Sequence, residues 1–142
     1  MKTHLSNGKA LPAHVPDAFF DAYVDAALWS STYSTEEDPD DYYNLDDGEH
    51  ELAPETFDAM LSDCADFFAY CESVGLDPIP EYNCPQYGDA EKSGHDFWLT
   101  RNGHGTGYWD RGLGPVGDKL TKAAETFGTS DLYVGDDGLI YQ

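Results

Sequence analysis

HDFWLTRNGHGTGYWDR, residues 95–111, places two aromatic-rich segments on either side of the sequence NGHG. Aromatic residues favour β-strands, and an Asn-Gly pair between two such segments is a strong short-range signal for a hairpin turn. Because glycine adopts turn conformations that other residues avoid, Gly94, Gly103, Gly105 and Gly107 are expected in tight turns and close contacts. The stretch therefore predicts a β-hairpin whose aromatic side chains pair across the two strands.

The segments before this hairpin predict two helices. Residues 16–29 begin with a proline, which the first turn of a helix tolerates, and carry apolar residues at helical spacing. Residues 54–74 carry a longer apolar stripe with acids on the other faces. Gly75 is placed to end this second helix, and Pro78 and Pro80 prevent its resumption.

The remaining segments complete the predicted order. Residues 30–51 are rich in acids and contain a proline and a glycine, which predicts a loop, and residues 76–94 predict an irregular connection. After the hairpin, residues 118–128 predict a short helix, and residues 131–142 predict a second hairpin that turns at 135–138. The fold class predicted is thus α+β in the order ααββαββ.

The length and composition indicate one domain. With 142 residues, of which 40% are hydrophobic, the chain is long enough for one core and too short for two, so we expect a single domain over residues 1–142. No apolar run approaches the roughly 20 residues of a membrane span, and the first residues lack the apolar centre of a secretory signal. We therefore expect the protein in the cytoplasm, as a monomer or a homodimer.

The three cysteines favour free thiols. Cys64 and Cys71 are seven residues apart in a predicted helix, roughly 10 Å along its axis, which is too far for a disulfide. Cys84 lies in the irregular connection, and the sequence has no CxxC motif. An odd number of cysteines without that motif predicts neither a disulfide framework nor a zinc site.

Charge is distributed unevenly along the chain. The formal net charge is −21, from 28 acids and 7 bases. No Lys or Arg occurs between Ala10 and Glu91, whereas residues 92–142 are near neutral. An acidic surface that serves only solubility would tolerate an occasional base and would extend into the last third. Because uncompensated charge destabilises the compact state, the acidic helical part, about residues 16–91, indicates a binding role.

The arrangement of the acids is typical of a surface that imitates DNA. In the first predicted helix, aspartates recur every four residues, about 6 Å apart along the axis, which is near the phosphate spacing of one DNA strand. We therefore expect a basic nucleic-acid-binding protein as the partner, with no direct nucleic-acid or membrane contact. The residues expected to bind it are Asp17, Asp21, Asp25, Glu36, Glu37, Asp38, Asp40, Asp41, Asp46, Asp47, Glu49, Glu51, Asp58, Asp63 and Asp66.

Other functions remain as alternatives. In the first alternative, the acidic surface binds a different basic host protein. A second alternative is a small enzyme that uses His95, Arg101 and His104, with Asp96 and Arg111 nearby in sequence. The histidines lack the spacing of metal ligands and the acids lack the EF-hand pattern, so we expect no cofactor and no metal. A third alternative is a non-standard divalent-ion site formed by Asp38, Asp40, Asp41, Asp46 and Asp47.

Two C-terminal segments carry a resemblance to a known group of proteins. GHDFWLTRNGHGTGYWDR, residues 94–111, and LYVGDDGLIY, residues 132–141, resemble stretches of a family of small bacteriophage and mobile-element proteins. The resemblance covers roughly the last third of the chain and implies a phage or plasmid origin and a compact C-terminal module. Together with the acidic surface, it leads us to expect a non-enzymatic inhibitor of a host defence system, either an anti-CRISPR or an antirestriction protein.

Overall fold

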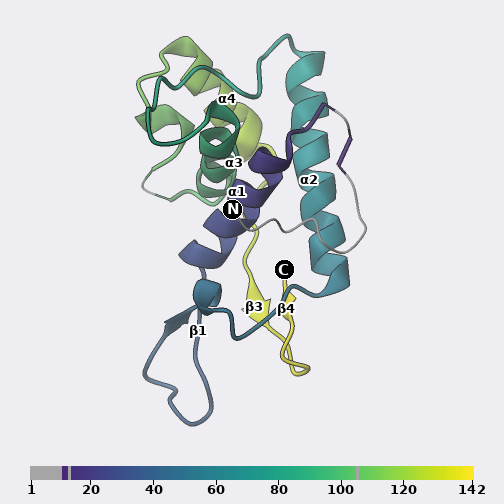
Figure 1. Ribbon diagram of the computed structural model, residues 1–142, viewed down its shortest axis with the longest axis vertical. Coiled ribbons are helices and arrows are strands. Elements are labelled where there is room, and N and C mark those ends of the chain that lie inside the picture. Colours follow the sequence, from purple (N-terminus) through teal and green to yellow (C-terminus); the bar gives the residue numbers. More distant parts are fainter. Residues whose placement is uncertain (1–10, 13, 105) are drawn as a thin grey trace.

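The structure, a computed structural model, describes residues 11, 12, 14–104 and 106–142. In this part of the chain, helices form the body of the molecule and two short antiparallel hairpins lie at one end of it (Figure 1). The helices are α1 (Asp17–Ser30), α2 (Pro54–Ser73), α3 (Asp89–Arg101) and α4 (Pro115–Glu125), with 3-10 turns η1 (Leu45–Asp47) and η2 (Tyr108–Asp110). The strands are β1 (Thr32–Tyr33), β2 (Tyr43–Asn44), β3 (Tyr133–Val134) and β4 (Ile140–Tyr141).

The predicted order ααββαββ is wrong, because residues 95–111 do not form a β-hairpin. The observed order is α1, β1, β2, α2, α3, α4, β3, β4. The first part of the predicted hairpin belongs to α3, which begins at Asp89, inside the segment that was expected to be irregular. Acids in the first turn of α3 and an arginine in its last turn suit the helix dipole. The second half of α3 is buried on nearly all sides, and its buried residues are Ser93, Gly94, Asp96, Phe97, Trp98, Leu99, Thr100 and Arg101.

The Asn-Gly pair of this stretch ends a helix and does not turn a hairpin. Gly103 has a φ of +68°, a conformation that glycine adopts without strain. Its amide donates to the carbonyl of Thr100 at 3.1 Å, and the amide of His104 donates to the carbonyl of Leu99 at 3.0 Å. These two bonds form a Schellman motif, which satisfies the last carbonyls of α3. Gly105 lies outside the described residues.

The other helices agree with the sequence prediction in position. α1 begins directly after Pro16, and α2 begins at Pro54. α2 ends as predicted: Gly75 has a φ of +71°, and the amide of Leu76 donates to the carbonyl of Cys71 at 2.8 Å. α4 starts three residues before the short helix that the sequence predicts for residues 118–128.

Both hairpins are short and antiparallel. The C-terminal hairpin is confirmed: Val134 pairs with Ile140, and the amide of Gly138 donates to the carbonyl of Gly135 at 3.0 Å in the turn. The acidic segment, predicted as a loop, contains a second hairpin in which Tyr33 pairs with Tyr43. Strands of two residues hold little structure by themselves, so these hairpins depend on the helical body for support.

The core is made largely of aromatic rings from α1, α2 and α3. Phe67 of α2 stacks on Phe97 of α3 with ring centroids 4.1 Å apart, and Phe19 of α1 meets Phe68 edge-on at 4.7 Å. The three cysteines are free, as predicted; Cys64 and Cys71 are buried beside these rings, and burial raises the pKa of the Cys71 thiol to about 12. Across the residues that the structure describes, no helix combines the length and apolar character of a membrane span.

Helices α1 and α3 approach each other most closely at Gly94. A Cβ atom built on Gly94 would overlap the backbone carbonyl of Phe19 on α1. Backbone cannot move aside as the end of a flexible side chain can, so only glycine fits at this crossing.

Gly94→Ala should therefore destabilise the protein by about 3 kcal/mol, because α1 and α3 must separate to admit the methyl group. Gly88→Ala is the matched control, since a Cβ at Gly88 meets no atom within 4 Å and should cost less than about 1 kcal/mol. Urea unfolding followed by circular dichroism measures both. Equal stability of the two variants would show that the helices do not cross as described.

Candidate functional site

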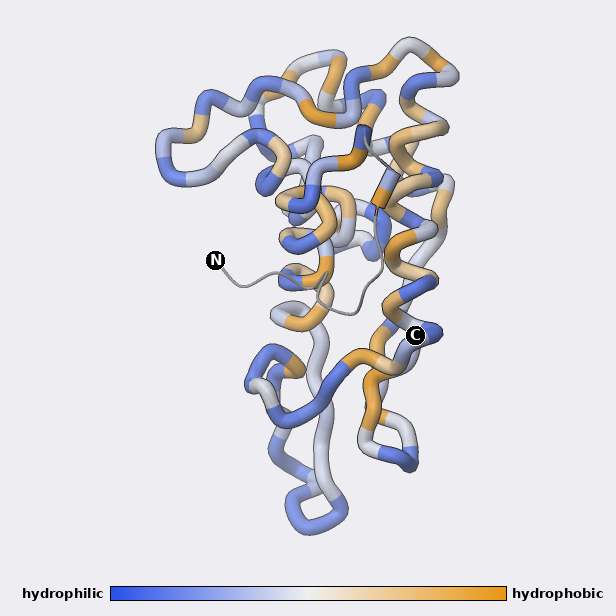
Figure 2. The backbone as a smooth tube through the Cα atoms, turned by 45° about the vertical axis from the view of Figure 1, so that its right-hand side comes forward, coloured by the Kyte–Doolittle hydropathy of each residue, from blue (hydrophilic) through white to orange (hydrophobic). Residues whose placement is uncertain are grey.

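Thirteen of the fifteen acids predicted to bind a partner are exposed. Nine of them lie between Glu36 and Glu51, within the segment from β1 to the start of α2 that we call the acidic hairpin (residues 32–51). The acidic hairpin projects beyond the end of α1 in Figure 1, and Figure 2 shows that its tip is hydrophilic. The body of the protein therefore holds this charge away from the core.

Tyrosine hydroxyls give the acidic hairpin its shape. Tyr33 donates to Asp47 at 2.7 Å, and Tyr43 donates to Asp38 at 3.0 Å, while the buried Leu45 anchors the segment to the core. The hydrogen bond to Asp47 raises the pKa of Tyr33 to about 12 and lowers the pKa of Asp47. Asp47 therefore stays ionised at neutral pH, and the hydrogen bonds fix the hairpin without neutralising it.

The C-terminal hairpin adds two aspartates to the same end of the molecule. β3 lies beside β1, and Asp136 and Asp137 are exposed at the tip of the turn (Figure 1). Tyr141 donates to Asp137 at 2.6 Å, which lowers the pKa of Asp137. Sequence reasoning missed these two acids because they belong to the near-neutral part of the chain. The Asp-Asp pair in a hairpin turn was the signal that could have found them.

The acids on the helices are not arranged as the sequence suggests. Asp17 and Asp25 are exposed on α1, but Asp21 between them is only 4% exposed. The three aspartates therefore do not present an exposed row at phosphate spacing. Asp58 and Asp66 are exposed on α2. The acidic hairpin is thus the main site of exposed negative charge among the predicted residues.

Arg101 and Asp63 serve the fold. The guanidinium of Arg101 lies in the interior with the residue 7% exposed, and its Nη1 atom donates to Asp63 of α2 and to the Tyr23 hydroxyl of α1, both at 2.8 Å. Its Nε donates to the carbonyl of Gly128 at 2.9 Å, and Nη2 donates to that of Phe127 at 3.0 Å, just beyond α4. One side chain of α3 therefore bonds to the three other helices or their ends.

A second ion pair holds the segment after α3. Asp96 is fully buried and accepts from Nη2 of Arg111 at 2.8 Å and from its Nε at 3.1 Å. The Tyr82 hydroxyl donates to the other oxygen of Asp96 at 3.0 Å. Within the described residues, every buried side-chain polar atom has a hydrogen-bond partner. The Arg111 guanidinium and the Tyr82 hydroxyl therefore compensate the buried charge of Asp96.

The alternative catalytic residues do not converge. Arg101 faces the interior, His95 lines a groove between α1 and α3, and His104 borders a separate surface pocket. The alternative divalent-ion site also lacks geometry: in the described part of the chain, no three His, Cys, Asp or Glu side chains are grouped so as to hold a metal ion. Among the residues that the structure describes, the candidate catalytic residues lie apart and the candidate metal ligands are not grouped as a site.

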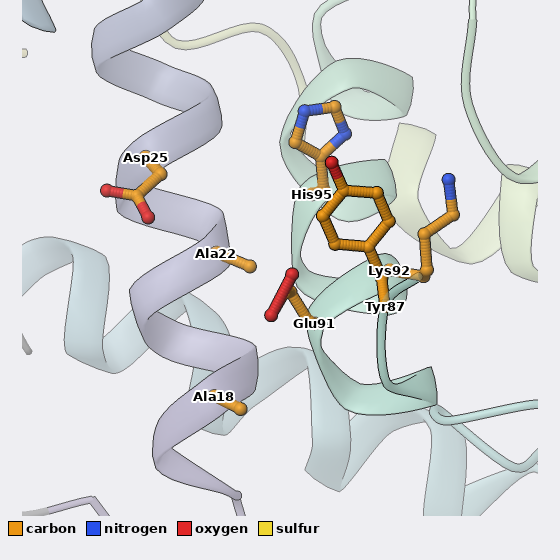
Figure 3. Close-up of a pocket in the computed structure, with 7 residues that line it drawn as sticks. All are labelled: Ala18, Ala22, Asp25, Tyr87, Glu91, Lys92 and His95. Carbon is orange, nitrogen blue, oxygen red and sulfur yellow. The ribbon is translucent and has the colours of Figure 1, made fainter. Parts of the chain in front are cut away.

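The groove beside His95 was not foreseen from the sequence. This α1–α3 groove encloses about 320 Å³ (Figure 3). Burial lowers the pKa of His95, and its ring lies 6.0 Å from that of Trp29. Its lining combines small apolar, charged and aromatic residues from two helices and the loop before α3: Ala18, Ala22, Asp25, Tyr87, Glu91, Lys92 and His95.

Comparisons of this chain with known protein families, with curated proteins and with solved structures found no match. The likeness of residues 94–111 to mobile-element proteins therefore stays a prediction. Packing accounts for much of that segment: Gly94 admits α1, Asp96 and Arg101 form buried ion pairs, and Tyr108 is buried. Gly107 packs against Thr100, whose hydroxyl accepts from the Tyr108 amide at 3.0 Å.

Arg101→Met should destabilise the protein by about 3 kcal/mol, because it leaves Asp63 without its cation and the interior hydrogen bonds unmade. Lys122→Met, at an exposed position of α4, is the control and should change stability by less than about 0.5 kcal/mol. Chemical denaturation measures both variants. If Arg101→Met keeps wild-type stability, the four helices are not held together by this arginine.

Proposed function

We propose that this protein is a non-enzymatic inhibitor encoded by a phage or mobile element, which acts in the host cytoplasm as an acidic mimic of DNA. It occupies the basic nucleic-acid channel of a host defence complex, such as a CRISPR effector or a restriction enzyme. The observation that supports this proposal is the acidic hairpin: nine exposed carboxylates on a projecting segment, joined by Asp136 and Asp137 of the neighbouring hairpin.

The distribution of basic residues favours a binding role for this charge. The two arginines of the chain lie on or after α3 and pair with Asp63 and Asp96 in the helical body. Lys119 and Lys122 lie on α4, at the end of the molecule away from the hairpins (Figure 1). Asp118 and Glu125 offset these lysines, so α4 is neutral overall while the hairpin end is acidic. This difference in charge favours one orientation of the molecule as it approaches a basic channel.

A basic channel built for DNA suits this surface for a physical reason. Such channels line the phosphate backbone with Lys and Arg, and neutralising those charges releases counterions. Carboxylates at the tip of the acidic hairpin compete for the same cations. Tyr42, which is 70% exposed among them, offers a ring on which a guanidinium can stack. The same surface also fits another basic host protein, and competition by DNA distinguishes the two.

The test compares two variants that lose the same number of charges. One neutralises acids of the hairpin that accept no tyrosine hydrogen bond: Glu36→Gln, Glu37→Gln, Asp40→Asn, Asp41→Asn and Asp46→Asn. The other neutralises five exposed acids elsewhere: Glu72→Gln, Glu81→Gln, Asp110→Asn, Glu125→Gln and Asp131→Asn. Binding to an RNA-guided nuclease and to a panel of restriction enzymes is measured across a salt series, with duplex DNA as competitor.

The wild type should bind at least one of these proteins, with affinity that falls as salt rises and with displacement by DNA. The hairpin variant should bind at least about tenfold more weakly, because it loses contacts that replace phosphates, while the control variant should change far less. Absence of binding to every basic nucleic-acid-binding protein at moderate salt would refute the proposal. Binding that DNA does not displace would favour a different basic partner.

A further inference from the structure

We propose that the outer face of the C-terminal hairpin, formed by β3, β4 and the turn between them, binds one arginine side chain of the basic partner. This inference rests on the proposed function for the identity of the partner, but the arginine site itself follows from the hairpin. Two stacked tyrosines, an open hollow and the two carboxylates of the turn meet on this face.

The C-terminal hairpin has two different faces because side chains alternate along its strands. Ile140 is fully buried in the core, and Val134, its partner in the pairing, packs against the core from β3. Tyr133 and Tyr141 pair directly opposite each other and therefore share the other face. Tyr133 is 56% exposed. One face thus anchors the hairpin, and the other presents a pair of aromatic rings to solvent.

The tyrosine pair is held in a fixed position. The rings of Tyr133 and Tyr141 stack with centroids 5.9 Å apart. A Cβ atom built on Gly135 would lie 2.6 Å from the Tyr141 ring, so this ring lies directly against the backbone of the turn. The Tyr141 hydroxyl donates to one oxygen of Asp137 at 2.6 Å, and the Leu139 amide donates to the other at 3.0 Å. Because ring and carboxylate are already ordered, a ligand loses less free energy in ordering them.

An open hollow brings the rings and the carboxylates within reach of one side chain. Its volume is about 620 Å³, and it is bordered by Tyr133, Val134, Gly135, Asp136, Asp137 and Tyr141. In Figure 1 the hairpin lies at the same end of the molecule as the acidic hairpin. A partner that binds the acidic hairpin therefore has this hollow beside it.

The charge of this face is negative. Both aspartates of the turn are exposed, and the described residues that border the hollow include no Lys, Arg or His. The hydrogen bond to Asp137 raises the pKa of Tyr141 to about 12, and the nearby charge of Glu55 on α2 acts in the same direction. His50 donates to a carbonyl of the turn at 2.8 Å. Even in its protonated form, His50 offsets only one of these three carboxylates, so the face attracts a cation.

The combination of rings and carboxylates favours arginine over other side chains. A guanidinium is planar, stacks on an aromatic ring and offers a fork of donors to a carboxylate, whereas an ammonium is a compact and strongly hydrated charge. An anion would be repelled, and an apolar side chain would remove the carboxylates from water without giving them a partner. Arginine is the side chain that uses both the exposed ring of Tyr133 and the carboxylates of the turn.

The probe for the arginine site is the blocked tripeptide acetyl-Gly-Arg-Gly-amide, titrated at constant salt into the full chain labelled with ¹⁵N. Saturable shift changes should centre on the amides of residues 133–141, and the δ-methylene protons of the arginine should shift upfield because they lie over an aromatic ring. The lysine analogue of the peptide should bind roughly fivefold more weakly.

Two variants separate the ring from the charge. Tyr133→Leu should weaken binding of the arginine peptide roughly fivefold and remove the upfield shift, while Tyr70→Leu, at an exposed position of α2, should do neither. Asp136→Asn should weaken binding by a similar factor, while Asp118→Asn, at an exposed position of α4, should not. Asp136→Asn leaves the hydrogen bonds of Asp137 in place, so it tests the site even if Tyr133→Leu loosens the hairpin.

Shift changes that spread over all exposed acids, equal binding of the two peptides, or binding that Asp136→Asn leaves unchanged would overturn the arginine site. The two proposals fail separately. If the arginine peptide binds the hairpin but no basic nucleic-acid-binding protein binds the chain, the proposed function fails alone. If such a protein binds the wild type, Tyr133→Leu and Asp136→Asn equally well, the inference of an arginine site fails alone.

Discussion

The guanidinium of Arg101 is the interaction on which the rest of the structure depends. From α3 it reaches Asp63 on α2, Tyr23 on α1 and the two carbonyls that follow α4. A buried arginine is stable only when its donors have partners, so the positions of all these groups are fixed relative to one another. The helical body is therefore built around one cation in a chain that has few.

This use of arginine separates the two kinds of charge in the molecule. The arginines hold the body together from within, and the hairpins at one end present carboxylates with no lysine or arginine between Ala10 and Glu91 to offset them. Hydrogen bonds from Tyr33, Tyr43 and Tyr141 fix those carboxylates without removing their charge. The fold thus presents an acidic surface in which three tyrosine hydroxyls position part of the exposed carboxylates.

The sequence predicted three helices and the last hairpin because their signals are local: an apolar stripe, a proline in the first turn, a glycine after the last turn. The prediction was wrong at α3 for two reasons. Burial on nearly all sides of this helix leaves no amphipathic stripe, and the Asn-Gly pair ends the helix where a hairpin turn was predicted. The exposure of the acidic hairpin followed from composition alone. The burial of Asp21, the pairing of Asp63 and the α1–α3 groove depend on contacts between helices distant in sequence, which no local pattern carries.

The central claim is that the charge of the acidic hairpin is kept for binding and opposes folding. Urea unfolding of the wild type and of the variant neutralised at 36, 37, 40, 41 and 46, each at low and at high salt, tests it most directly. The account predicts that the neutralised protein is at least as stable as the wild type at low salt, and that the difference shrinks as salt screens the repulsion. A neutralised protein that is less stable than the wild type at both salt concentrations would contradict the account, because the carboxylates would then belong to the structure itself.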